Sequence, residues 1–79
     1  MMTNFRIEAL RDDYVIVKAD SKRFGKQEIM FEGNTFTQCF DYIKNETGKD
    51  TLQLRSYFIY EPIRDREGKC FPCIMEVAN

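Results

Sequence analysis

The chain has 79 residues, of which 43% are hydrophobic and 14% aromatic, and its 12 basic and 13 acidic side chains give a formal net charge of −1 at pH 7. This composition excludes a disordered chain, a broadly basic nucleic-acid binder and a strongly acidic mimic of DNA. The length predicts a single domain, residues 1–79, with a small core.

The first three predicted elements are strands. Residues 4–10 alternate, with Phe5, Ile7 and Ala9 on one side and charged residues on the other, which is typical of a half-buried strand. Residues 11–13 then form a turn, and the β-branched run of residues 14–19 predicts a second strand, paired with the first as a hairpin. A polar loop over residues 20–26 leads to a third strand at residues 27–32.

The next predicted element is a helix over about residues 35–47. Thr35 and Gln38 match the capping-box pattern, and Gly48 is suited to the left-handed position that ends a helix. The apolar stripe that should face the core consists of Phe36, Cys39, Phe40 and Ile43.

The C-terminal part predicts two long strands, residues 51–63 and 69–77, joined by a tight turn at residues 65–68. Pro72 should interrupt the second of them, because proline has no N–H for a sheet. The order β-β-β-α-β-β predicts an α+β fold, a small and mostly antiparallel sheet with one helix packed on one face.

Catalytic chemistry has little support in the residue inventory. The chain has no histidine, and therefore lacks the common general base and the commonest metal ligand. Its paired carboxylates, Asp12–Asp13 and Asp65/Glu67, lie in predicted turns, where we expect them to be solvated. Phosphate-binding glycine motifs are also absent from the sequence. We expect no catalytic residue, no cofactor and no metal.

Cys70 and Cys73 form the pair that most resembles a motif, so a small thiol or zinc protein is one alternative. A zinc site needs four ligands, and Cys39 is the only other cysteine. In a regular strand two residues three apart also point to opposite faces. The odd number of cysteines and the absence of a signal-peptide pattern favour a reducing, cytoplasmic location. No apolar run is long enough to span a membrane.

A second alternative is a single-stranded nucleic-acid-binding module. Residues 14–26 carry a net charge of +3, with an aromatic residue among the basic ones. Such a loop suits phosphate contact and base stacking. The candidate residues are Lys18, Lys22, Arg23, Phe24 and Lys26.

The favoured interpretation is protein binding. One helix cannot cover both faces of the sheet, so aromatic and apolar side chains near the C-terminus should be left for a partner. The candidate partner-binding residues are Tyr57, Ile59, Tyr60, Ile63, Phe71 and Met75. The sequence thus favours a non-enzymatic inhibitor or adaptor of a larger complex, of which small phage or mobile-element proteins are one class. A homodimer is the alternative use of the same surface, because a near-neutral chain repels its own copies little.

Overall fold

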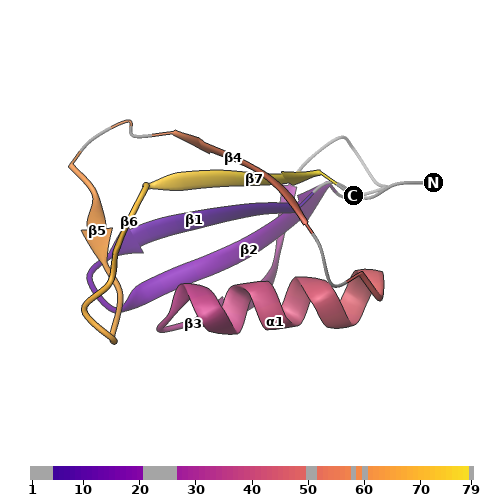
Figure 1. The fold of residues 1–79 in the computed structure, drawn as a ribbon, viewed down its shortest axis with the longest axis horizontal. Helices are drawn as coiled ribbons and strands as arrows, with labels where there is room; N and C mark the ends of the chain where they lie inside the picture. Colours follow the sequence, from indigo (N-terminus) through magenta and orange to yellow (C-terminus); the bar gives the residue numbers. More distant parts are fainter. Residues whose placement is uncertain (1–4, 21–26, 50–51, 58, 60, 79) are drawn as a thin grey trace.

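The computed structural model describes residues 5–20, 27–49, 52–57, 59 and 61–78. Within them five strands form one antiparallel sheet in the order β3-β2-β1-β7-β4, and two short strands pair separately (Figure 1). The elements are β1 Phe5–Arg11, β2 Tyr14–Asp20, β3 Gln27–Gly33, α1 Phe36–Thr47, β4 Gln53–Tyr57, β5 Ile63–Arg64, β6 Cys70–Phe71 and β7 Ile74–Ala78. The predicted α+β class, an antiparallel sheet with one helix, is confirmed.

The predicted hairpin of β1 and β2 is present, in the register that the alternation requires. Ile7 pairs with Val17 and Ala9 with Val15, and all four side chains are buried. The turn between the strands uses Asp13 at φ 70°, a left-handed conformation that aspartate tolerates better than most residues. Alternation therefore predicted both the strand and the face that it buries.

Of the two long C-terminal strands predicted, residues 69–77 are interrupted at Pro72 as expected, whereas residues 51–63 do not form one continuous strand. β4 ends at Tyr57, and the next strand among the described residues, β5, begins at Ile63, directly after Pro62. Pro72 separates β6 from β7, as expected for a residue that cannot donate to a sheet. The consequence is a separate β5–β6 hairpin, which lies at one end of the main sheet (Figure 1).

Helix α1 begins and ends as its sequence predicted. The Thr35 hydroxyl accepts a hydrogen bond from the Gln38 N–H at 3.2 Å, and the Gln38 side-chain oxygen accepts from the Thr35 N–H at 3.2 Å. Gly48 has φ 70°, and its N–H donates to the Lys44 carbonyl at 2.7 Å. Both ends thus satisfy backbone groups that a helix otherwise leaves unpaired.

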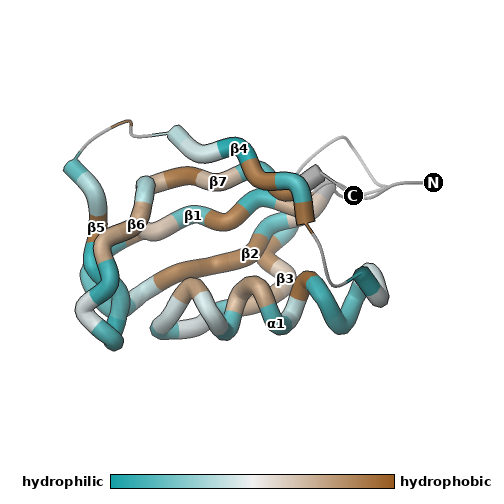
Figure 2. The backbone as a smooth tube through the Cα atoms, in the orientation of Figure 1, coloured by the Kyte–Doolittle hydropathy of each residue, from teal (hydrophilic) through white to brown (hydrophobic). Residues whose placement is uncertain are grey.

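The core lies between α1 and one face of the sheet, and Figure 2 shows hydrophobic residues concentrated along β2 and β7. The helix contributes Phe36, Cys39 and Ile43, all fully buried. It packs mainly against β2 and β3, where Tyr42 stacks on Phe31 with ring centroids 5.1 Å apart. The helix is therefore displaced toward the β3 side of the sheet.

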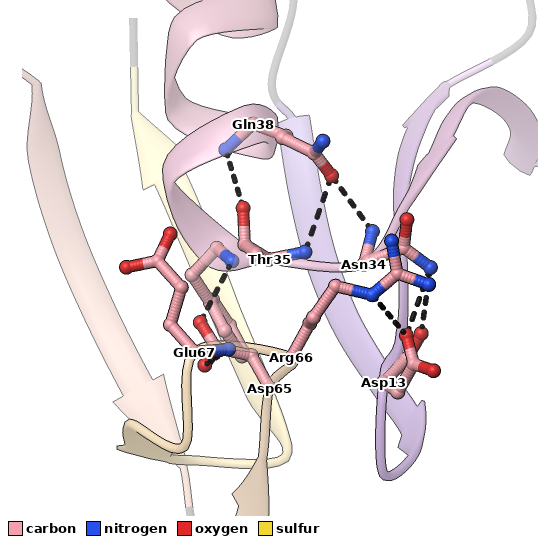
Figure 3. Close-up of polar contacts among 8 residues, drawn as sticks. Asp13, Asn34, Thr35, Gln38, Asp65, Arg66 and Glu67 are labelled. Carbon is pink, nitrogen blue, oxygen red and sulfur yellow. Dashed lines mark hydrogen bonds and ion pairs between the residues drawn. The ribbon is translucent and has the colours of Figure 1, made fainter.

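The β5–β6 turn is anchored to the start of the helix (Figure 3). One carboxylate oxygen of Asp65 accepts from the N–H groups of Glu67 and Lys69, each at 3.0 Å, and the other accepts from the Phe36 N–H at 3.4 Å. Asp65 is only 5% exposed, which corrects the expectation of a solvated turn acid. Its hydrogen bonds give it a structural role.

Candidate functional site

The face of the sheet opposite α1, called here the helix-free face, carries an ion cluster near its centre. The Glu8 carboxylate lies 3.1 Å from Lys18 Nζ and 3.0 Å from Arg6 Nε. The Arg6 contact is an ion pair without hydrogen-bond geometry, since Arg6 Nε has no hydrogen-bond partner. Partly exposed pairs of this kind contribute at most about 1 kcal/mol each. Lys18, predicted for nucleic-acid binding, is therefore already paired within the sheet.

Charges balance in two rows of described residues on the helix-free face. The strand pairing places basic and acidic side chains in two neighbouring rows across the sheet. The rows contain Arg6, Lys18, Arg55, Glu8, Glu32 and Glu76. Within these two rows, three cations are matched by three anions, so the described rows carry no excess of positive charge that would attract a polyanion. The other nucleic-acid candidates, Lys22, Arg23, Phe24 and Lys26, lie outside the described residues.

The centre of the helix-free face is also closed. Ile16 points to this face and is 1% exposed, so the side chains around it leave no opening there. Tyr14, two residues before it, donates its hydroxyl hydrogen to Glu32 at 3.0 Å. This bond is the main reason that the pKa of Tyr14 is raised, because it favours the protonated phenol. An accessible apolar site must therefore lie toward the edge or end of the sheet.

Of the predicted partner-binding residues, Met75 belongs to the core, and Phe71 is partly buried against it. Met75 is 5% exposed, because β7 directs it to the helix side, and it must be removed from the partner-binding set. The Phe71 ring stacks on Phe36 with centroids 4.0 Å apart, so its main contact is internal. Sequence alone could not say which sheet face the helix covers, and both assignments depended on that choice.

Three of the other predicted partner-binding residues lie near one another. Tyr57, partly buried, ends β4 opposite Ile74, and Ile59 follows it with 55% of its surface exposed. Ile63 is partly buried against the edge of the core. Tyr60 lies outside the described residues. The structure thus brings Tyr57, Ile59 and Ile63 to the same end of the sheet.

At this end the side chains surround a pocket of about 280 Å³, called here the end pocket. Ile59, from the chain segment between β4 and β5, and Ile63 of β5 meet Leu10 of β1 and Ile74 of β7 there. Leu10 is 51% exposed. The complete lining is Glu8, Ala9, Leu10, Ile59, Glu61, Ile63, Cys73 and Ile74. The walls are mainly apolar, with two carboxylates among them.

Sequence reasoning missed Leu10 and Ile74, although Leu10 carried a usable signal. In the alternation of β1 it falls on the side of Arg6 and Glu8, where a large aliphatic residue is out of pattern. Ile74 had no such signal, because its neighbour Met75 is equally apolar and either could have faced the core.

A second hollow of about 280 Å³ runs between α1 and β4 and is called here the helix–β4 groove. It exists because the helix lies over β2 and β3 and leaves the β4 side of the same sheet face open. Leu54, at 50% exposed, is its most accessible apolar residue. The lining residues are Thr37, Phe40, Asp41, Lys44, Leu52 and Leu54.

The three cysteines are all free and lie in three different environments. Cys39 lies on the buried face of α1, and loss of solvation raises the pKa of its thiol to about 12. Cys73 is buried and its thiol donates to the Glu61 carbonyl at 3.3 Å, whereas Cys70 is exposed. In the described part of the chain, no three His, Cys, Asp or Glu residues group to hold a metal ion. The arrangement gives the zinc alternative no support.

Comparison of the chain with protein-family models, with curated proteins and with solved structures finds no match. Within the described ranges, α1 is too short and too polar to cross a bilayer, and no other helix is present.

Proposed function

We propose that this chain is a non-enzymatic binding protein that acts through protein–protein contact, as an inhibitor or adaptor of a larger complex. The observation that carries the proposal is the exposure of two large aliphatic side chains, Leu10 and Ile59, at 51% and 55%, on either side of an apolar pocket. Apolar surface gathered around a hollow is typical of a binding site for a protein side chain.

The lining of the end pocket indicates what the partner would present. An apolar side chain would fill the space among Leu10, Ile63 and Ile74. The carboxylate of Glu61 at the rim would favour a neighbouring lysine or arginine on the partner. Tyr57 pairs with Ile74, a residue of the pocket lining, and therefore lies beside the pocket. Its side chain would extend the contact with the partner.

The proposal also covers the location of the protein, its origin and its oligomeric state. The free thiols of Cys39, Cys70 and Cys73 are typical of a reducing compartment, which supports action in the cytoplasm. A phage or mobile-element origin follows only from how common small inhibitors are in such genomes. A homodimer through the end pocket is the competing use of the same apolar surface.

The first experiment is capture of partners from a lysate of the organism that encodes the chain, with and without nuclease. The tagged chain is compared with Ile59→Asp and Leu10→Asp, each of which places a charge beside the end pocket. The matched control is Met30→Asp, because Met30 is also about half exposed, at 46%, but lies on β3. A partner retained by wild type and by Met30→Asp, and lost by both end-pocket variants, supports the proposal.

Other outcomes of the capture decide between the alternatives. A partner that remains bound to both end-pocket variants contradicts this placement of the site. A partner that is no longer recovered after nuclease treatment instead supports nucleic-acid binding. The affinity of the chain for single-stranded nucleic acid should then fall tenfold or more between about 50 and 200 mM salt. The residues responsible would be Lys18, Lys22, Arg23, Phe24 and Lys26. Sedimentation of the purified chain shows whether it forms a homodimer, which distinguishes self-association from binding of a protein partner or of nucleic acid.

A further inference from the structure

The two edges of the main sheet differ in how well they resist another strand. β3, at one edge, has a register shift in its pairing with β2 between Ile29 and Phe31. Such a bulge bends an edge strand and hinders further pairing. β4, at the other edge, pairs with β7 without a shift over Gln53–Tyr57. Among the described residues no strand covers its outer side, so β4 presents a regular row of backbone N–H and C=O groups.

The helix–β4 groove lies directly beside this edge. Tyr42 holds one flank of α1 against Phe31 of β3, and the opposite flank, which includes Phe40, borders the groove. Leu54 points into the groove from β4. A strand added next to β4 would therefore have every second side chain directed toward Phe40 and Leu54, in line with the alternation of a sheet.

On the other side of β4, the charge of Arg55 indicates the chemistry of the added strand. Its guanidinium lies 5.8 Å from the centroid of the Tyr57 ring, over that ring. Glu76 is the cross-strand partner of Arg55 on β7, but in the described part of the chain no carboxylate lies within ion-pair distance of Arg55. A residue placed opposite Arg55 is thus favoured when it is Asp or Glu.

The same charge argues against a second copy of this chain as the occupant. Arg55 is the central residue of β4, so antiparallel pairing of two β4 strands over their full length places Arg55 opposite Arg55. Like charges directly opposite one another destabilise a strand pair. A different chain that carries an acidic residue there meets no such penalty.

We propose that β4 accepts an extended segment of a partner protein as an additional strand, with an apolar side chain in the helix–β4 groove and an acidic side chain opposite Arg55. This site goes beyond the proposed function, because no residue of β4 lines the end pocket. The backbone bonds would supply affinity, while Leu54 and Arg55 would select the sequence.

The test uses a phage-displayed library of random 12-residue peptides, selected on the immobilised full chain. Enriched peptides are synthesised, and their affinity is measured for wild type, Leu54→Lys and Arg55→Glu. Ile59→Asp and Met30→Asp serve as controls for the end pocket and for β3. Both sites of substitution in β4 are exposed, and a melting curve for each variant checks that the fold is retained.

We expect the enriched peptides to alternate apolar residues with Asp or Glu, and to shift the amide NMR signals of Gln53–Tyr57. Arg55→Glu should weaken binding about fivefold or more, and replacement of the peptide's acidic residue by Lys should restore it. Methylation of those peptide amides that face β4 should abolish binding. The end-pocket variant should bind the peptide as wild type does.

Three results would overturn the inference. One is a library that yields no enriched peptide, and another is peptides that bind wild type and Arg55→Glu equally. The third is a concentration-dependent dimer that Leu54→Lys abolishes, because the edge would then be occupied by a second copy. Since the control variant Ile59→Asp leaves β4 intact, failure here is distinguishable from failure of the end pocket.

Discussion

Asp65, in the turn between β5 and β6, accepts a hydrogen bond from the backbone N–H of Phe36, the first residue of α1, at a distance of 3.4 Å. The carboxylate also organises its own turn, through the N–H groups of Glu67 and Lys69. A single buried side chain therefore joins the C-terminal hairpin to the start of the helix.

Removal of this carboxylate should destabilise the protein without changing its surface. Asp65→Ala leaves three backbone N–H groups without their acceptor, and we expect a loss of about 2–3 kcal/mol in the free energy of unfolding. Urea titration measures this loss. Glu67→Ala is the control, because Glu67 is exposed and so is the ion pair that it forms with Lys69 at 3.3 Å. Equal stability of the two variants would contradict the structural role of Asp65.

Phe71 should act on stability and not on binding. Its ring stacks on Phe36 at 4.0 Å, so Phe71→Ala removes a contact of the core and should cost about 2–4 kcal/mol. Ile59→Ala, on the exposed segment after β4, should cost less than about 0.5 kcal/mol. Thermal unfolding of the two variants makes the comparison, and a small loss for Phe71→Ala would return this residue to the partner-binding set.

The cysteines should differ in reactivity. Cys70 is exposed, whereas the pKa of about 12 for Cys39 leaves almost no thiolate near neutral pH. Iodoacetamide at pH 8 should therefore modify Cys70 within minutes, and Cys39 only after unfolding. Peptide mass spectrometry identifies the modified residue. Rapid labelling of Cys39 in the folded protein would show that the helix opens readily.

Gly48 should be sensitive to substitution for a conformational reason alone. Its φ is 70°, and a Cβ atom placed there would meet no atom within 4 Å. We therefore expect Gly48→Ala to cost about 1 kcal/mol through backbone strain. Gly48→Asn should cost less, because asparagine tolerates this conformation better. Identical losses for the two variants in urea titration would contradict backbone strain as the cause.

Local patterns predicted the first half of this fold well. The alternation of β1 and the caps of α1 at Thr35 and Gly48 act through neighbouring residues, so the sequence alone revealed them. The interruption at Pro72 was also predicted, but the order of the strands was not, because it depends on how β7 pairs with both β1 and β4. The burial of Asp65 was hidden for the same reason, since its partner Phe36 is distant in sequence.

The candidate site was predicted only in part. Ile59 and Ile63 were chosen because a single helix must leave some apolar residues uncovered, and both line the end pocket. Met75 was misplaced because neighbouring residues of a strand point to opposite faces, and nothing local distinguishes Met75 from Ile74. The helix–β4 groove depends on the lateral position of α1, which no periodicity encodes.

The pairing of Phe5 with Val77 places the first and the last described strands side by side, with β1 between β2 and β7 (Figure 1). During synthesis, β1 and β2 leave the ribosome before β7, so the second edge of β1 stays open until β7 follows. The nascent chain therefore carries a half-apolar strand with one unpaired edge while residues 21–73 are made. Closing so distant a contact is also a slow step in refolding.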